Sequence, residues 1–127
     1  MPEPSSFEYA VLRVVPQVER EEFINVGVIL FCLAARFLDA RIRLDAARLE
    51  AIAPELDRAM IQQHLNLIPR ICAGEADSGA LAELTQAERF RWLASPSSTV
   101  IQPSPVHTGL CDDPQAALDD LFQKLVT

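Results

Sequence analysis

The segment Phe23–Leu33 (FINVGVILFCL) decides the fold, because its β-branched and aromatic residues favour a strand. An earlier apolar segment, Phe7–Val15, stops at Pro16. A later one, Phe37–Leu44, alternates apolar and polar side chains as a half-buried strand does. Short connections join the three segments, and parallel strands would need a long crossover. We therefore predict an antiparallel three-stranded meander.

The next part of the sequence predicts two helices. Asp45 can cap a short helix through Ile52, and Pro54 suits the first turn of a longer one. Pro69 lacks the amide that an interior turn requires, so it should kink or end the second helix before Gly74. The core-facing side chains of this helix are expected at three-to-four spacing: Leu56, Met60, His64, Leu67 or Ile68, and Ile71.

Two more helices are expected nearer the C-terminus. Thr85 and Glu88 form a capping box before a short helix. Asp113 and Pro114 start a terminal helix that has a clear apolar stripe. Between these helices a short fourth strand is expected near residues 99–102. The predicted fold class is therefore α+β, an antiparallel meander with a fourth strand, covered on one face by helices.

The composition fits one small domain. With 127 residues, half of them apolar, the chain is long enough for one core and short for two. We expect a single domain over residues 1–127, with 1–6 as a flexible N-terminal extension. The net charge of −7 weighs against nonspecific nucleic-acid binding and against docking on an anionic membrane.

Other features of the sequence predict a cytoplasmic protein. Its three cysteines are widely spaced and give no disulfide framework, as in a reducing compartment. The first residues do not have the basic and apolar segments of a secretory signal. The uncharged run Phe23–Ala35 is shorter than the roughly 20 residues that span a bilayer.

Strand pairing would gather polar residues on one face of the meander. In the simplest register Arg13 faces Asn25, and the third strand places Arg41 opposite Ile29, with Arg43 on the same side. The same face would also carry apolar side chains: Tyr9, Phe23, Ile29 and Phe31. The opposite face is uniformly apolar and should meet the helices: Ala10, Leu12, Val14, Ile24, Val26, Val28, Leu30, Cys32, Leu38, Ala40 and Ile42.

The arginines of the mixed face could bind an anion. Arginine pairs with carboxylate or phosphate through parallel hydrogen bonds. Gly27 lies within a strand, where glycine often marks close approach by a ligand or by another backbone. The alternative is that carboxylates of the chain neutralise the arginines, the candidates being Glu22, Asp39 and Asp45.

The segment Ser95–Gly109 is rich in proline and serine and surrounds the expected fourth strand. Ordered long loops in compact domains are often functional, and the prolines would fix the position of His107, a weak candidate for a general base. His107 and Cys111 have a spacing that zinc sites use, but no second ligand pair is visible, so no metal is expected. The Gly-rich loops that bind nucleotides are absent from the sequence, and no cofactor is expected.

The stretches Tyr9–Pro16 (YAVLRVVP), Glu22–Phe31 (EFINVGVILF), and Glu88–Leu93 (ERFRWL) followed by Ser98–Pro105 (STVIQPSP) together are similar to one protein family. They resemble small bacterial proteins catalogued as domain of unknown function 3037, from the first strand to about Cys111. The resemblance implies no established activity. It implies a protein partner, because relatives are encoded beside a kinase that resembles toxin–antitoxin kinases. The motif positions that it singles out are Arg13, Glu22, Asn25, Gly27, Ser98, Thr99, Gln102, Ser104, Pro105 and His107.

We expect a non-enzymatic interaction or accessory domain, which uses the mixed sheet face and Ser95–Gly109 to bind a protein. The partner would be the kinase or a second copy of the chain. The alternative is a small enzyme or anion-binding domain in which Arg13, Asn25 and the Ser98–His107 loop hold phosphate or carboxylate. The candidate binding residues are Arg13, Glu22, Asn25, Gly27, Arg41, Arg43, Ser98, Thr99, Gln102, Ser104 and His107.

Overall fold

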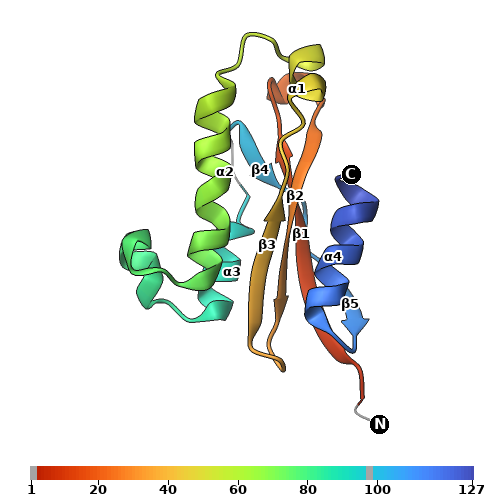
Figure 1. Ribbon diagram of the computed structural model, residues 1–127, viewed down its shortest axis with the longest axis vertical. Helices are drawn as coiled ribbons and strands as arrows, with labels where there is room; N and C mark the ends of the chain where they lie inside the picture. Colours follow the sequence, from red (N-terminus) through yellow and green to blue (C-terminus); the bar gives the residue numbers. More distant parts are fainter. Residues whose placement is uncertain (1–2, 97–98) are drawn as a thin grey trace.

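An antiparallel sheet forms the middle layer of the structure (Figure 1). The computed structural model describes residues 3–96 and 99–127 of the chain. β1 (Ser5–Val14) pairs with β2 (Ile24–Cys32), and β2 pairs with β3 (Phe37–Ile42). The predicted α+β class and the antiparallel meander are confirmed.

The second edge of β1 is occupied by two short strands from the C-terminal part of the chain. β4 (Ile101–Pro103) pairs with residues 12–14 of β1, and β5 (His107–Cys111) pairs with residues 5–9. β4 is the predicted fourth strand, whereas β5 was not predicted. Ser5 already belongs to β1, so the last two residues of the expected N-terminal extension are part of the sheet.

Helices cover both faces of the sheet. α2 and α3 lie on one side and α4 on the other, so the prediction of helices on one face only was wrong (Figure 1). None of the helices in the described part of the chain has the length and apolar character needed to cross a bilayer. The elements are α1 (Ala46–Ile52), α2 (Arg58–Ala73), α3 (Gln86–Leu93), α4 (Pro114–Leu125) and the 3₁₀ segments Val18–Arg20 and Ala76–Glu83.

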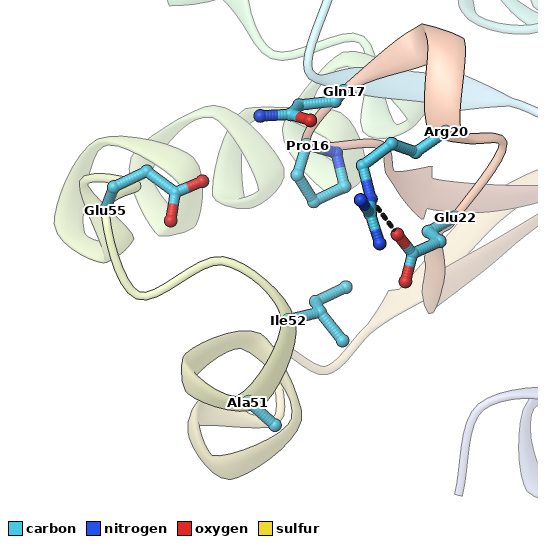
Figure 2. Close-up of a pocket in the computed structure, with 7 residues that line it drawn as sticks. All are labelled: Pro16, Gln17, Arg20, Glu22, Ala51, Ile52 and Glu55. Carbon is cyan, nitrogen blue, oxygen red and sulfur yellow. Dashed lines mark hydrogen bonds and ion pairs between the residues drawn. The ribbon is translucent and has the colours of Figure 1, made fainter.

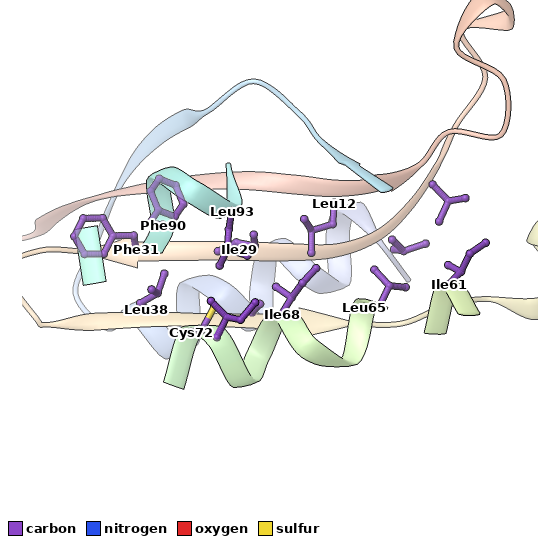
Figure 3. Close-up of a cluster of buried hydrophobic side chains, with 14 of the residues drawn as sticks. Leu12, Ile29, Phe31, Leu38, Ile61, Leu65, Ile68, Cys72, Phe90 and Leu93 are labelled. Atoms are coloured by element: carbon purple, nitrogen blue, oxygen red, sulfur yellow. The ribbon is translucent and has the colours of Figure 1, made fainter. Parts of the chain in front are cut away.

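Two apolar clusters form the core, one on each face of the sheet. The larger packs the sheet against α2 and α3, and includes Leu12, Ile29 and Phe90 (Figure 3). The smaller packs Val28 and its neighbours against α4, whose apolar stripe is the predicted one. Each fully buried Leu, Ile, Val or Phe side chain stabilises the fold by about 1.5–3 kcal/mol relative to an exposed one.

A β-bulge in β2 changes the register of the sheet. Arg13 faces Asn25, as predicted, but the pairing shifts by one residue at the next step of β1. Beyond this point Arg41 faces Val28 rather than Ile29, so the predicted register of the third strand was wrong. The extra residue is Val26, which has no partner in β1 and whose carbonyl accepts the amide hydrogen bond of Arg43 at 2.7 Å.

Beyond the bulge, the side chains of β2 point to the opposite face of the sheet from the one predicted. Ile29 and Phe31, predicted on the mixed face, pack in the α2 cluster. Val28, Leu30 and Cys32, predicted to face that helix, pack against α4. Both sets are buried, so the apolar run of β2 serves two cores at once.

Gly27 makes the bulge possible because no side chain fits at this position. A Cβ atom on Gly27 would lie 2.7 Å from the carbonyl oxygen of Arg41 and 2.8 Å from Cδ1 of Ile42. The close approach is therefore made by the backbone of β3, the second of the two possibilities that the sequence left open.

The helix boundaries follow local capping chemistry. Asp45 caps α1 as predicted, but α2 begins after Asp57, whose carboxylate accepts from the amide of Met60, and not at Pro54. The helix continues through Pro69 and ends at Gly74, which adopts the left-handed conformation (φ 69°).

The buried face of α2 lies one residue away from the predicted stripe. Its core residues are Ile61, Leu65, Ile68, Ile71 and Cys72. Ile68 and Ile71 were expected on this face, Ile68 as the alternative to Leu67, and both are buried. Met60 and His64, which were also expected there, are exposed, and Leu67 is 46% exposed.

The capping box of α3 gives a pH-dependent contribution to stability. The amide of Thr85 donates to the Glu88 carboxylate at 3.0 Å, and this bond lowers the pKa of Glu88 below its ordinary value. A carboxyl group with a lowered folded-state pKa stabilises the fold above its unfolded-state pKa, and this contribution disappears as pH falls through the folded-state pKa.

We therefore expect Glu88→Gln to unfold at lower urea concentration than the wild type at about pH 7 and at nearly the same concentration at about pH 2. Glu83→Gln is the control, because the Glu83 side chain is exposed and makes no hydrogen bond within residues 3–96 and 99–127. A deficit that persists unchanged at acidic pH would contradict the proposed role of the charge.

Candidate functional site

Arg13 and Asn25 lie side by side on the α4 face of the sheet. The Arg13 guanidinium stacks on Phe23, with its carbon 4.1 Å from the ring centroid. The Nε of Arg13 and the Oδ1 of Asn25 are both buried and have no hydrogen-bond partner among the described residues. Arg13 also lines a surface hollow of about 350 Å³, together with Glu21 and Gln102.

Asn25 ties the end of α4 to the sheet. Its Nδ2 donates to the carbonyl of Leu125 at 3.0 Å, and the Arg48 guanidinium donates to the carbonyl of Val126 at 3.2 Å. The last carbonyls of a helix have no partner within the helix, and they carry a partial negative charge that favours donors and cations. The contact of Asn25 therefore anchors a helix.

The other two candidate arginines do not join Arg13. Arg41 forms an ion pair with Asp119 of α4 at 3.1 Å and stacks on Phe122, 4.3 Å from its centroid. Arg43 is exposed beyond the end of β3. A carboxylate neutralises one of the arginines, as the alternative held, although Asp119 was not among the carboxylates proposed for this role.

Glu22 belongs to a different hollow, between the 3₁₀ turn after β1 and α1 (Figure 2). It forms an ion pair with Arg20, and both side chains are largely exposed. Glu55 approaches the same hollow from the segment after α1 (Figure 2). Exposed charges that pair with each other contribute little stability and leave no free charge for a ligand.

Ser104 has a structural position in the sheet. Its side chain is buried, its Oγ accepts from the amide of Val11 at 2.8 Å, and it donates to the carbonyl of Pro105 at 2.9 Å. It occupies the junction between β4 and β5, where Pro105 cannot extend the ladder. The Ser104 hydroxyl thus accepts the amide hydrogen bond of Val11 that a backbone carbonyl of the ladder would otherwise accept.

The remaining loop candidates lie near β4. Gln102 donates through Nε2 to the carbonyl of Thr99 at 2.8 Å, and Thr99 donates through Oγ1 to the carbonyl of Ile101 at 2.8 Å. Gln102 is the partner of Arg13 in the β1–β4 pair. Ser98 lies outside the described residues.

His107 and Cys111 lie at opposite ends of β5. The His107 ring packs on Tyr9 at 5.3 Å between centroids, and the side chain is exposed. Four strand residues span about 13 Å, too far for both side chains to bind one zinc ion.

Burial raises the pKa of the Cys111 thiol, with Cys32 and the acidic neighbours Asp112 and Asp113 adding to the effect. Within the described chain no group of three acidic, His or Cys side chains is arranged for a metal.

The candidate binding residues therefore occupy several separate places. Arg13, Asn25 and Gln102 are neighbours, whereas Glu22 and Arg41 have their own partners. His107 pairs with Tyr9, which lies four residues before Arg13 in β1, about 13 Å along the strand. The expected arrangement of an arginine site with His107 as base is not assembled.

An apolar groove lies between α2, α3 and residues 99–103. It consists of two adjoining hollows of about 420 and 260 Å³ that share His64, Thr99 and Ile101. Three exposed large side chains flank it: Met60, Leu67 and Trp92, of which Trp92 is 55% exposed. We call this depression the α2 groove. Its lining consists of Leu12, Leu56, Asp57, Met60, Ile61, His64, Leu67, Ile68, Ile71, Trp92, Leu93, Ser95, Pro96, Thr99, Val100, Ile101 and Pro103.

Most of the lining of the α2 groove comes from two segments without charged residues. Residues 59–69 of α2 and residues 92–111 contain no Asp, Glu, Lys or Arg. Charged residues make up 23% of the whole chain, so these 31 positions would on average include about seven. Depletion of charge distinguishes the centre of protein interfaces from the rest of a surface.

The sequence of α2 itself indicates an apolar surface beyond the core. α2 has an apolar arc wider than its contact with the sheet, since Met60, His64 and Leu67 adjoin the stripe that is buried. Met60 and His64 were expected in the core, and Leu67 as the alternative to Ile68. The segment Ser95–Gly109, selected as the second part of the contact surface, does form part of the opposite wall.

We expect Ser104→Ala to lower the free energy of unfolding by about 1–3 kcal/mol, because the buried amide of Val11 would lose its acceptor. Ser95→Ala removes an exposed hydroxyl that donates to the carbonyl of Arg91, and should cost clearly less. Urea denaturation of both variants is the measurement. Equal stability of Ser104→Ala and the wild type would show that this serine is available for another role.

The family described as Protein of unknown function (DUF3037) matches residues 9–126, which is nearly the whole chain. No curated protein and no solved structure matches the chain.

Proposed function

The chain belongs to the DUF3037 family, and we propose that it is a protein-binding accessory domain that uses the α2 groove. The observation that supports this proposal is the exposure of Met60, Leu67 and Trp92 along a groove whose described lining includes one charged residue, Asp57. Contiguous exposed apolar surface of this kind marks an interaction site in soluble proteins. The mixed sheet face is no longer a candidate for the contact, because α4 covers it.

The partner segment is an amphipathic helix. Recognition of an extended peptide at a sheet edge requires a row of unpaired backbone groups. The β4 edge of the α2 groove offers few, because the carbonyl of Ile101 accepts from Thr99 and Pro103 has no amide. A ligand here must satisfy its own backbone hydrogen bonds, and a helix does so while presenting apolar side chains.

The dimensions and charge of the α2 groove define this helix further. Within α2 the lining extends from Met60 to Ile71, about 16 Å at the rise of a helix, which corresponds to roughly three turns. Asp57 is the only charged residue in the lining and lies at one end. We infer a partner helix with apolar residues at three-to-four spacing and a basic residue that meets Asp57.

The test is site-specific photocrosslinking in the native host, with p-benzoylphenylalanine in place of Met60. Mass spectrometry of the crosslinked product should identify one helical segment with the inferred pattern. A synthetic peptide of that segment should shift the emission of Trp92, the only tryptophan of the chain, to shorter wavelength as the α2 groove fills. Leu67→Lys should weaken this binding at least tenfold.

Leu33→Lys is the control, since Leu33 is also an exposed leucine, lies in the β2–β3 turn and is not part of the α2 groove. Its affinity for the peptide should equal that of the wild type. The proposal is wrong if crosslinking from Met60 gives only products that also form from the distant Val18, or if the captured segment binds Leu67→Lys as tightly as the wild type.

A second candidate function, anion binding, rests on the unpaired guanidinium of Arg13. No carboxylate within residues 3–96 and 99–127 forms an ion pair with it, and its hollow also contains the amide of Gln102. The hollow is open and includes Glu21, which disfavours anions. We therefore rank this function below helix binding.

We expect Arg13→Met to change the free energy of unfolding by less than about 1 kcal/mol, because loss of the Phe23 contact is offset by removal of the buried, unbonded Nε. If the hollow binds anions, phosphate should raise the melting temperature of the wild type but not of Arg13→Met, relative to sodium chloride at equal ionic strength. Equal responses of the two proteins would exclude Arg13 as an anion ligand.

A further inference from the structure

We propose that β5 is a dimerisation edge, through which two copies of the chain pair antiparallel to form one continuous sheet. β5 has β1 on one side only, and the other side of the strand has no partner in the described chain. A second surface, separate from the α2 groove, would thus bind a second copy of the chain.

At the other two sheet edges, side chains or proline occupy or remove some of the outward backbone groups. At β3 the amide of Ala40 donates to the carboxylate of Asp39 at 2.8 Å, which occupies a donor that faces away from β2. At β4 the Ile101 carbonyl accepts from Thr99, and Pro103 has no amide. Natural sheets protect exposed edges with devices of this kind.

β5 has none of these devices. Odd-numbered residues of β1 point their backbone groups towards β4 and β5, as the bond from the amide of Ser104 to the carbonyl of Val11 shows. Strand alternation therefore turns the backbone groups of Thr108 and Leu110 outward. In the described part of the chain no side chain bonds to them, and the strand contains neither proline nor charge.

The exposed side chains of β5 also suit a partner strand. Leu110 is 71% exposed and Val106, just before the strand, is 42% exposed. In an antiparallel pair centred on Gly109, Leu110 of each copy lies opposite Thr108 of the other, and apolar and β-branched pairs of this kind stabilise sheets. The Phe7 ring covers Gly109 on the α4 face of the sheet. The contact with a second copy would therefore form at the backbone edge of β5 and not on that face.

Charge favours a second copy in the antiparallel orientation. The chain has a net charge of −7, so most of its surface opposes self-association, whereas β5 is neutral. Asp112 follows the strand directly and would lie opposite Val106 of the second copy. The two Asp112 side chains would then be about 20 Å apart, beyond the screening length of roughly 8 Å at physiological salt. Parallel pairing would bring them together.

The test is the mass of the full chain in reducing buffer by sedimentation velocity and light scattering, across micromolar to submillimolar concentrations. The wild type should move from 14.1 kDa towards twice this mass. Leu110→Lys should remain at the monomer mass, because each Leu110–Thr108 contact would lose its apolar side chain and the two lysines would lie only about 7 Å apart along the pairing edge. Leu33→Lys, which changes a leucine of 73% exposure in another part of the sheet, should behave as the wild type.

Hydrogen exchange of the wild type gives a second measurement that does not depend on a variant. The amides of Thr108 and Leu110 should exchange at least several-fold more slowly at high than at low concentration, while the exchange of α2 is unchanged. A monomer at all concentrations would overturn the proposal, as would a dimer that persists in Leu110→Lys. A dimer broken by Leu67→Lys but not by Leu110→Lys would assign self-association to the α2 groove instead.

Discussion

The approach of the β3 backbone to Gly27 is the constraint on which the rest of the sheet depends. The Arg41 carbonyl occupies the space that a side chain would need, so β2 can bulge at Val26 and continue with its faces exchanged. As a result one apolar strand supplies Ile29 and Phe31 to the α2 layer and Val28 and Leu30 to the α4 layer.

Coverage of both faces has a direct consequence for where function can reside. α4 buries the face that carries Arg41 and Asn25, and these side chains hold the helix in place through Asp119 and the carbonyl of Leu125. Polar groups that looked available for a ligand are thus engaged in tertiary contacts. What remains open is the apolar surface that α2 has in excess of its contact with the sheet, together with the edge of β5.

Most of the architecture could be predicted from the sequence, because it depends on local signals. Strand composition, the Asp45 cap, the capping box at Thr85 and the stripe of α4 are each visible in a few residues. The bulge was not predictable in the same way, because the run Val26–Cys32 is apolar throughout and its pattern does not reveal which residue faces which layer. The face of α2 was misplaced for the same reason, since two adjacent apolar stripes compete for the core.

β1 pairs with β4 and β5, which come from the C-terminal part of the chain, and this pairing affects how the protein folds. The amide of Val11 finds its acceptor on Ser104, 93 residues later in the sequence. During synthesis β1 can pair with β2 early, but its other edge stays open until β4 and β5 have left the ribosome. Contacts of such long sequence separation slow folding, because the entropy of closing the loop is lost before the contact forms. Until β4 and β5 are in place, the second edge of β1 has unpaired backbone groups, which is the kind of strand edge through which incompletely folded chains associate.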